Sequence, residues 1–233
     1  MNVLIACEES QAVCIEMRRL GHRAFSCDIQ DCSGGHPEWH IKGDVLPILN
    51  GNCTHHTQTG RWDLIIAHPP CTYLSNVATR SFSLRVTDAE KVVKRWENRA
   101  RAAVFFMQFI LADCPRVAVE NPVGFMSSAY RKADQIIHPY QFASSVESAE
   151  YVTKATCLWL KGLPKLRVNN LPKPNNREIY GVMPSGKTKT WEDSLCRKGG
   201  AARVRSKTFP GIARAMAEQW AGSAQHDKED KDG

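Results

Sequence analysis

The residues best suited to chemistry are a cysteine and a glutamate, each of which follows a short apolar run. Cys71 comes directly after Pro69 and Pro70, and Glu120 stands at the end of a later run. The two prolines stiffen the turn that presents the thiol. A thiolate is a strong nucleophile, and a carboxyl group beside it can act as a general acid. The pair predicts covalent catalysis, although an isolated cysteine is more often a small residue of the core.

The elements that must position these residues alternate between strand and helix patterns. We predict strands at 2–7, 24–27, 63–67, 116–120, 136–142 and 156–161, and helices at 10–20, 87–111 and 210–220. The strand assignments rest on short apolar runs and the helix assignments on apolar residues at helical spacing. Thr87 and Glu90 form a capping-box pattern at the start of the long helix. This rhythm predicts an α/β fold with a mostly parallel sheet and helices on both faces.

Polar side chains follow four of the predicted strands. In open α/β sheets, ligands bind in the crevice beyond the carboxyl ends of the strands. In chain order, the polar groups after these strands are Cys7-Glu8-Glu9-Ser10, then Asp28, then His68 to Ser75, and finally Glu120-Asn121-Pro122. The sequence therefore predicts one site at this edge of the sheet.

The order of these motifs resembles the DNA cytosine-5 methyltransferase family. The Pro-Cys pair at 70–71 and the Glu-Asn pair at 120–121 resemble two motifs of that family, and residues 208–217 resemble its C-terminal motif. Residues 1–220 are similar to small phage and prophage members of this class. The resemblance implies a Rossmann-like class I S-adenosylmethionine-dependent methyltransferase fold with a small, irregular, basic C-terminal insertion.

The resemblance also implies a role for each candidate residue. Cys71 would add to C6 of cytosine, and Glu120 would hydrogen-bond or protonate N3. S-adenosylmethionine is the implied cofactor, with Asp28 at its ribose hydroxyls and Asp44 near its adenine. The remaining implied contacts are Ala6, Cys7, Glu8, Ser10 and Pro69 for the cofactor, and Pro70, Asn121, Lys154 and Thr156 for the DNA substrate. Lys187 and Lys189 belong to the basic segment, and we expect them to contact DNA phosphates or to be plain solvated charges.

The chain departs from the family pattern in several places. Residues 6–11, Ala-Cys-Glu-Glu-Ser-Gln, replace the glycine-rich first motif, and Pro122 stands where the family has Val. The Gln-x-Arg-x-Arg motif that steadies the flipped base is missing, and Lys154 or Thr156 could substitute for it in part. Residues 162–207 leave room for only a small target-recognition region, which implies short or loose sequence specificity.

The length and composition suit one globular domain with an appendage, since the chain has 233 residues and is 42% hydrophobic. We divide it into a catalytic domain of residues 1–161 plus 208–222, a small basic target-recognition-like region of residues 162–207, and a disordered tail of residues 223–233. These boundaries follow the change from periodic patterns to a stretch rich in Pro, Asn, Lys and Gly.

Positive charge is concentrated in the last third of the chain. Residues 154–222 hold 14 Lys and Arg against 4 Asp and Glu, a net charge of +10, whereas residues 1–153 have a net charge of −1. A basic face of this kind most often binds nucleic acid through its phosphates. DNA is therefore the expected partner, and a monomer is the favoured state.

The cellular setting is predicted from what the sequence lacks. It has no signal peptide and no apolar stretch long enough to cross a bilayer. Its nine scattered cysteines do not form a disulfide framework, and the cysteines and histidines of residues 27–56 lack the Cys-x-x-Cys spacing of a zinc knuckle. We expect a cytoplasmic protein of a bacterium or a phage-infected cell, with no membrane partner and no metal.

Three other interpretations of the sequence compete with a cytosine-5 methyltransferase. Residues 181–188 match the P-loop pattern, but no buried strand precedes them and no helix follows, so we predict no nucleoside triphosphate site. An amino-methyltransferase acting on adenine N6 or cytosine N4 would carry an aromatic residue where His-Pro-Pro-Cys at 68–71 ends in Cys, and it leaves Glu120 unexplained. A non-catalytic DNA-binding relic of the fold is the third hypothesis, against which the retained thiol and carboxyl argue.

Overall fold

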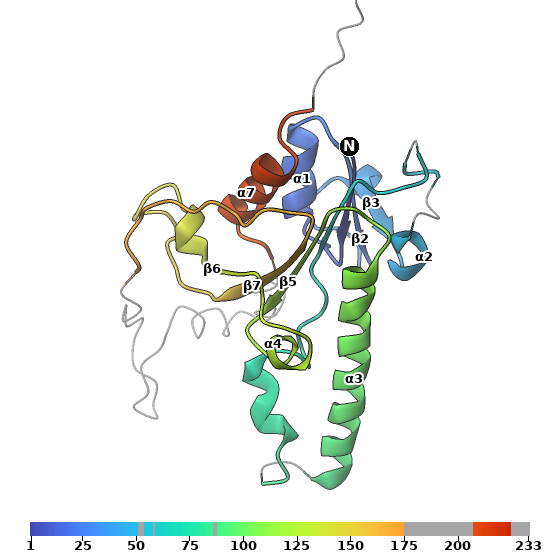
Figure 1. Ribbon diagram of the computed structural model, residues 1–233, viewed down its shortest axis with the longest axis vertical. Helices are drawn as coiled ribbons and strands as arrows, with labels where there is room; N and C mark the ends of the chain where they lie inside the picture. The colour runs from blue at the N-terminus through green and yellow to red at the C-terminus, as the bar shows by residue number, and fades with distance from the viewer. Residues whose placement is uncertain (51–53, 58, 86–87, 175–206, 225–233) are drawn as a thin grey trace, which may run out of the picture.

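The computed structural model describes residues 1–50, 54–57, 59–85, 88–174 and 207–224 (Figure 1). These residues form an α/β fold around one seven-stranded sheet. Its strands are β1 (Asn2–Ala6), β2 (Arg23–Asp28), β3 (His40–Lys42), β4 (Leu64–Ala67), β5 (Val117–Pro122), β6 (Gln135–Ile137) and β7 (Thr156–Lys161).

The strand order is β3-β2-β1-β4-β5-β7-β6, which resembles the sheet of Rossmann-like methyltransferases. The first five strands in this order pair in parallel, and β7 pairs antiparallel with both β5 and β6. The chain moves outward from β1 to β3 and then returns to β4 on the other side of β1. Ligands of open α/β sheets bind where the strand order reverses in this way, beyond the carboxyl ends of the strands.

The central strands β1 and β4 are apolar at every position except Asn2 because both of their faces are covered. In β1, Val3 and Ile5 belong to one buried cluster, whereas Leu4 and Ala6 belong to the cluster on the opposite face. Strands buried on both faces read as continuous apolar runs rather than as an alternation with polar residues. The prediction of a mostly parallel sheet from these runs is confirmed.

Helices cover both faces of the sheet, as predicted (Figure 1). α1 (Ala12–Arg19) and α7 (Pro210–Trp220) contact each other and pack on one face. α3 (Ala89–Leu111) packs on the other face through Phe106 and Phe109, both fully buried. The helix predicted at residues 210–220 is thus confirmed as α7, and it packs beside α1, the first helix of the chain.

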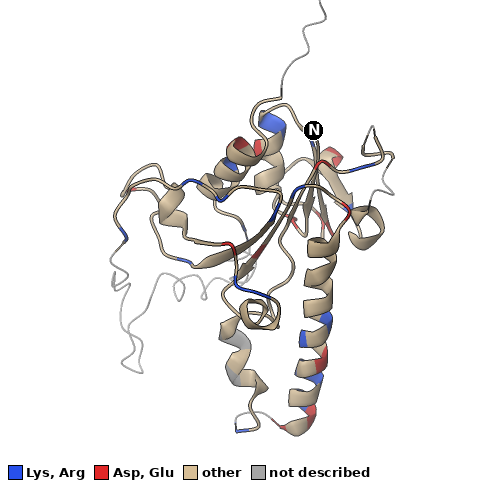
Figure 2. Ribbon diagram, viewed as in Figure 1, with Lys and Arg blue, Asp and Glu red and all other residues tan. Residues whose placement is uncertain are grey.

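Charge divides α3 into two halves. Figure 2 shows Lys, Arg, Asp and Glu gathered on the part of α3 that projects away from the sheet, and residues 102–111, which pack against the sheet, include none. The shorter helical segments are η1 (Pro37–Trp39), α2 (Leu46–Leu49), η2 (Asn76–Phe82), α4 (Met126–Ala129) and η3 (Pro139–Phe142). Among the described residues, no helix is both long and apolar enough to cross a membrane.

Two details of the predicted elements are wrong. Asp88 caps α3, since its Oδ1 accepts a hydrogen bond from the Lys91 backbone N–H at 3.0 Å, and Thr87, the predicted cap, lies outside the described residues. Asp is as good a helix cap as Thr, so the adjacent residue could take the role. The strand predicted at 136–142 ends at Ile137, because Pro139 has no N–H for the sheet and begins η3 instead.

Candidate active site

The loops that follow the central strands begin side by side. The backbone N–H of His68 donates to the carbonyl of Ala6 at 2.9 Å, and that of Glu8 donates to the carbonyl of Cys27 at 3.2 Å. These two bonds continue the parallel pairing of β4, β1 and β2 one step past the strands. The predicted site residues after these strands therefore share one edge of the sheet, with Glu120 and Asn121 at the end of β5.

The loop that carries Cys71 is joined to the end of β5. Asn121, only 2% exposed, donates from Nδ2 to the carbonyl of Pro69 at 2.7 Å. The carbonyl of Cys71 accepts from the backbone N–H groups of Leu74 and Ser75 at 3.0 and 2.9 Å, so a turn begins at the cysteine. Cys71 itself is exposed. Cys71 is thus an exposed residue of a loop that is hydrogen-bonded to Asn121 at the end of β5.

A second junction holds the far side of this loop. The backbone N–H of Phe125 donates to the carbonyl of Leu74 at 2.7 Å, and Ser75 forms a β-bridge with Gly124. A Cβ on Gly124 would lie 2.0 Å from the oxygen of Leu74, so only glycine fits there. The sequence prediction missed this residue. Its signal was a glycine two residues after Pro122, at the end of a buried strand.

Arg99 of α3 holds the loop that begins at Cys71 through a hydrogen bond and ring contacts. Its Nε donates to the carbonyl of Tyr73 at 2.9 Å, and its guanidinium lies 3.5 Å from the centre of the Phe82 ring and 4.8 Å from that of Phe125. Arg99 is 6% exposed, which is rare for an arginine. The prediction missed it, although Arg99 stands seven residues after Val92 and seven before Phe106, on the buried face of the helix.

His68 and Glu120 form a largely buried hydrogen-bonded pair at this edge. Nδ1 of His68 lies 2.8 Å from Oε2 of Glu120, and their side chains are 7% and 20% exposed. Burial raises the pKa of Glu120, but the hydrogen bond and charge of His68 outweigh it, so the net shift is downward. Burial lowers the pKa of His68, whereas Glu120 and, more weakly, Glu8 raise it to a net upward shift. The two residues therefore stabilise each other's charged forms.

Lys154 and Thr156 lie next to the end of β5. The charge of Lys154 reaches both members of the hydrogen-bonded pair and lowers the pKa of each. Thr156 is buried and begins β7 directly opposite Pro122. The structure thus brings both predicted substitutes for the missing arginine motif near Glu120. Lys187 and Lys189, as well as the P-loop-like residues 181–188, lie outside the described residues.

The loop between β1 and α1 keeps a glycine-like backbone without glycine. Cys7 and Gln11 both have φ of 59°, in the left-handed region that glycine normally occupies. Gln11 is fully buried and makes two hydrogen bonds to the backbone of His36, at 2.8 and 3.1 Å. These bonds clamp the loop that ends at His36 onto the start of α1. Such contacts are what hold a strained backbone in place.

Glu8 serves the helix that follows it. Its carboxylate accepts from the backbone N–H groups of Val13 and Cys14 at 2.7 and 3.2 Å, and the residue is 3% exposed. Burial raises the pKa of Glu8 to about 7, an effect that His68 and the two N–H groups partly offset. The carboxylate predicted to contact a cofactor is therefore committed to the N-terminus of α1. The same N–H groups are the ones an anionic ligand would otherwise use.

Asp28 is the last residue of β2, and Asp44 lies two residues after the end of β3. Each accepts a local backbone hydrogen bond, from Gln30 at 2.9 Å and from Leu46 at 3.0 Å respectively. Their charges, together with the larger effect of burial, raise the pKa of the Cys7 thiol. The predicted cofactor residues Asp28, Asp44 and Cys7 therefore lie within electrostatic range of one another. Of the others, Ala6 is fully buried and Ser10 partly buried.

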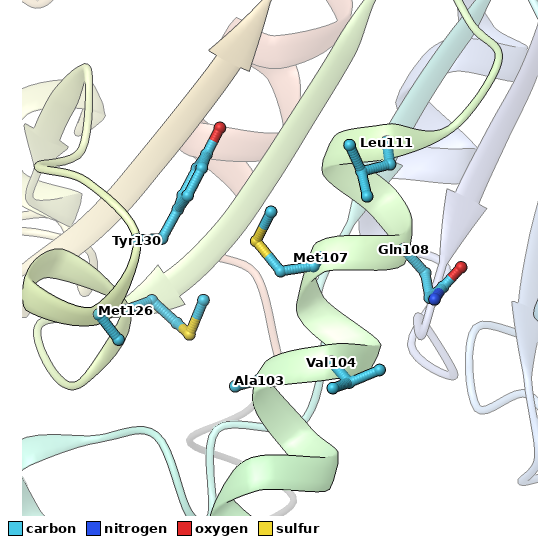
Figure 3. Close-up of a pocket in the computed structure, with 8 residues that line it drawn as sticks. Ala103, Val104, Met107, Gln108, Leu111, Met126 and Tyr130 are labelled. Carbon is cyan, nitrogen blue, oxygen red and sulfur yellow. The ribbon is translucent and has the colours of Figure 1, made fainter.

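A hollow elsewhere on the molecule has a different character. It measures about 450 Å³ and lies between α3 and α4, with Val104, Met107, Leu111 and Tyr130 among its lining (Figure 3). None of its lining residues is acidic, basic or a cysteine. The groups able to do chemistry lie instead at the edge of the sheet. In the described part of the chain, no three His, Cys, Asp or Glu residues are placed to hold a metal ion.

The sequence matches no protein-family model and none of the curated proteins. Its function is therefore inferred from the fold and from the groups at this edge.

Proposed function

We propose that this protein is a DNA (cytosine-5)-methyltransferase, which transfers a methyl group from S-adenosylmethionine to C5 of cytosine. The observation that carries the proposal is the 2.7 Å hydrogen bond from Asn121 to Pro69, which joins the loop of Cys71 to the strand that ends in Glu120. Cys71 follows β4 and Glu120 lies near the end of β5, the adjacent parallel strand, and the crevice beyond such strand ends is where ligands of open α/β sheets bind. That is the arrangement a covalent attack on a base requires.

Cys71 would open the reaction as the nucleophile. C5 of cytosine is a poor nucleophile until a group adds to C6. The Cys71 thiolate donates its electron pair to C6, the ring electrons move towards N3, and a proton from the side of Glu120 binds N3. C5 then takes up the methyl group. The proton at C5 then passes to water, its electron pair forms the C5–C6 double bond, N3 gives back its proton, and the sulfur leaves C6 as a thiolate.

The residues at the β1–β3 end fit the cofactor that this chemistry needs. When bound, S-adenosylmethionine supplies an electrophilic methyl group. Asp28 would accept hydrogen bonds from its ribose hydroxyls, and Asp44 would accept one from its adenine amino group. The backbone turn at Cys7 and Gln11 has the conformation that a glycine-rich loop would adopt. Glu8 already occupies the N-terminal amides of α1, so the cofactor's carboxylate must bind elsewhere.

Two buried polar atoms, one on the residue that follows β4 and one near the end of β5, have no hydrogen-bond partner among the described residues. These atoms are Nε2 of His68 and Oδ1 of Asn121. Buried polar atoms are nearly always hydrogen-bonded, so each of these atoms calls for a ligand or a water molecule. This supports a polar substrate, such as a base, at the Glu120 end of the edge.

The expected macromolecular partner is DNA. A base must leave the duplex stack before a thiolate can reach C6, at a cost of a few kcal/mol. The net charge of +10 on residues 154–222 suits a segment that holds the phosphate backbone while the base is out. We expect the protein to act in the cytoplasm, where DNA and cofactor are both present.

Methyl transfer tests the proposal directly. Purified protein is mixed with DNA and isotopically labelled S-adenosylmethionine, and the DNA is digested to nucleosides for mass spectrometry. We expect label in 5-methyldeoxycytidine, lost in Cys71→Ser and kept in Cys32→Ser, whose cysteine follows β2. Label in an N4- or N6-methylated nucleoside would establish an amino-methyltransferase instead. Absence of label together with absence of cofactor binding would establish a non-catalytic relic.

A further inference from the structure

We propose that His68 acts through Glu120 as the residue that holds the proton destined for N3 of the bound cytosine. His68 is then a positioning residue with a proton to deliver, and Glu120 is the group that touches the base. This inference rests on the proposed function and adds a residue to its machinery.

The position of the imidazole is fixed by its neighbours along the chain. The backbone N–H of His68 is bonded to Ala6 at 2.9 Å, and the next carbonyl, that of Pro69, is bonded to Asn121 at 2.7 Å. The proline ring restricts the backbone between these two bonds. The backbone that carries the imidazole is therefore held in place, and Nδ1 lies 2.8 Å from Oε2 of Glu120. The second carboxylate oxygen, Oε1, can then contact a ligand.

The charged groups around His68 favour the protonated ring. Glu120 faces it from the end of β5, and Glu8 acts on it from the loop after β1. Lys154, which precedes β7, opposes them. The side chain of His68 is 7% exposed, so water screens these charges weakly. The two carboxylates outweigh Lys154 and burial together, so the net shift in the pKa of His68 is upward, which favours a protonated ring beside an ionised Glu120.

An ionised Glu120 has no proton of its own to give. When the Cys71 thiolate adds to C6, one negative charge moves into the ring of the base. One proton leaves the imidazolium of His68, is passed on by the carboxylate of Glu120, and ends on N3. The products are a neutral adduct, a neutral imidazole and a carboxylate, so charge and protons balance. When the sulfur leaves, the same proton returns to His68.

A titration of the free protein tests the protonation state without DNA or cofactor. Heteronuclear NMR follows the ring nitrogens of His68 as the pH is varied. We expect a midpoint above the ordinary histidine pKa of about 6.5, which falls in Glu120→Gln and, by less, in Glu8→Gln. A midpoint at or below about 6.5, or one that Glu120→Gln leaves unchanged, would overturn the inference.

A second experiment follows the addition step itself. DNA with tritium at C5 of cytosine releases tritium to water when a thiolate adds to C6 and N3 is protonated, even without methyl transfer. His68→Asn places an amide donor near the position of Nδ1 but cannot hold the proton. We expect release to slow by about 100-fold, as for loss of a general acid, and to lose its fall at high pH. The exposed His55→Asn is the matched control and should release tritium at the rate of the wild type.

The outcomes separate this inference from the proposed function. Tritium release by the wild type that persists in His68→Asn, with the same rate and pH profile, would overturn the role of His68 alone. Wild-type protein that releases no tritium and methylates no cytosine would overturn the proposed function and this inference with it.

Discussion

Gly124 and Leu74 approach so closely that a Cβ on the glycine would lie 2.0 Å from the carbonyl oxygen of the leucine. This contact holds the loop that begins at Cys71 against the segment that follows Glu120. Because the atom in the way belongs to the backbone, no rotation of a side chain can relieve a clash there. The catalytic thiol and carboxyl of the proposed mechanism thus depend on a residue that has no chemistry of its own.

Gly124→Ala should therefore damage both stability and activity. We expect it to lower the unfolding free energy by about 1–3 kcal/mol, as overpacking does, and to slow methyl transfer by displacing the Cys71 loop. Gly222→Ala is the control, since a Cβ there meets no atom within 4 Å and the substitution carries only the cost of a positive φ, which Gly124 does not have. It should lose about 1 kcal/mol and keep its activity. Equal activity in the two variants would contradict the role given to the contact.

Arg99→Met should loosen the loop from the other side. It leaves the carbonyl of Tyr73 without its donor and removes the guanidinium from the Phe82 ring. We expect a loss of about 1–3 kcal/mol in urea unfolding. Arg101→Met changes an exposed residue of the same helix and should stay within about 0.5 kcal/mol of the wild type. A loss of similar size in both variants would mean that Arg99 matters only as a positive charge.

The left-handed backbone at Cys7 predicts that glycine and alanine substitutions rank in opposite orders of stability at Cys7 and at Cys14. At Cys7, glycine removes the strain that alanine keeps, so Cys7→Gly should be more stable than Cys7→Ala by about 1 kcal/mol. At Cys14, inside α1, glycine should be less stable than alanine by about 1 kcal/mol. Urea unfolding of the four variants measures both differences. Alanine more stable at both positions would mean that the turn at Cys7 is not left-handed.

Stability should fall as the pH rises from about 5 to 7. The folded protein raises the pKa of Glu8 from 4.5 to about 7, so the folded state binds more protons than the unfolded state in this range. That difference corresponds to a loss of the order of 3 kcal/mol, and the raised pKa of His68 extends the fall to higher pH. Glu120 affects stability at lower pH. Because its pKa is lowered in the folded protein, its contribution to the free energy of unfolding is lost only under acid conditions. The free energy of unfolding, plotted against pH, should fall more steeply for the wild type than for Glu8→Gln across this range. Parallel plots for the two proteins would contradict the pKa assigned to Glu8.

The central sheet could be predicted from the sequence because its strands are buried on both faces and therefore contain runs of three to four consecutive apolar residues, such as residues 3–6, 64–67 and 117–119. The carboxyl-end location of Cys71 and Glu120 followed from the same runs. β3 (His40–Lys42) was missed because a three-residue edge strand leaves no such run. The capping residue of α3 was misplaced because Thr87 and Asp88 are adjacent and chemically similar as caps.

Long-range contacts were beyond the reach of local patterns. The bond between His68 and Glu120 joins residues 52 positions apart, and the bond between Arg99 and Tyr73 spans 26. Glu8 shows the same limit in another way. A carboxylate at a strand end suggests a ligand contact, but in the structure this carboxylate caps the following helix. Whether a polar group serves the fold or a ligand depends on its neighbours in space.

Covalent trapping tests the central claim most directly. DNA containing 5-fluoro-2′-deoxycytidine is incubated with the protein and S-adenosylmethionine, because fluorine at C5 blocks the final elimination and preserves the bond to C6. We predict a stable protein–DNA adduct that peptide mapping places on Cys71, absent in Cys71→Ser and slower to form in Glu120→Gln. An adduct on another cysteine, or active methylation without any adduct, would contradict the account.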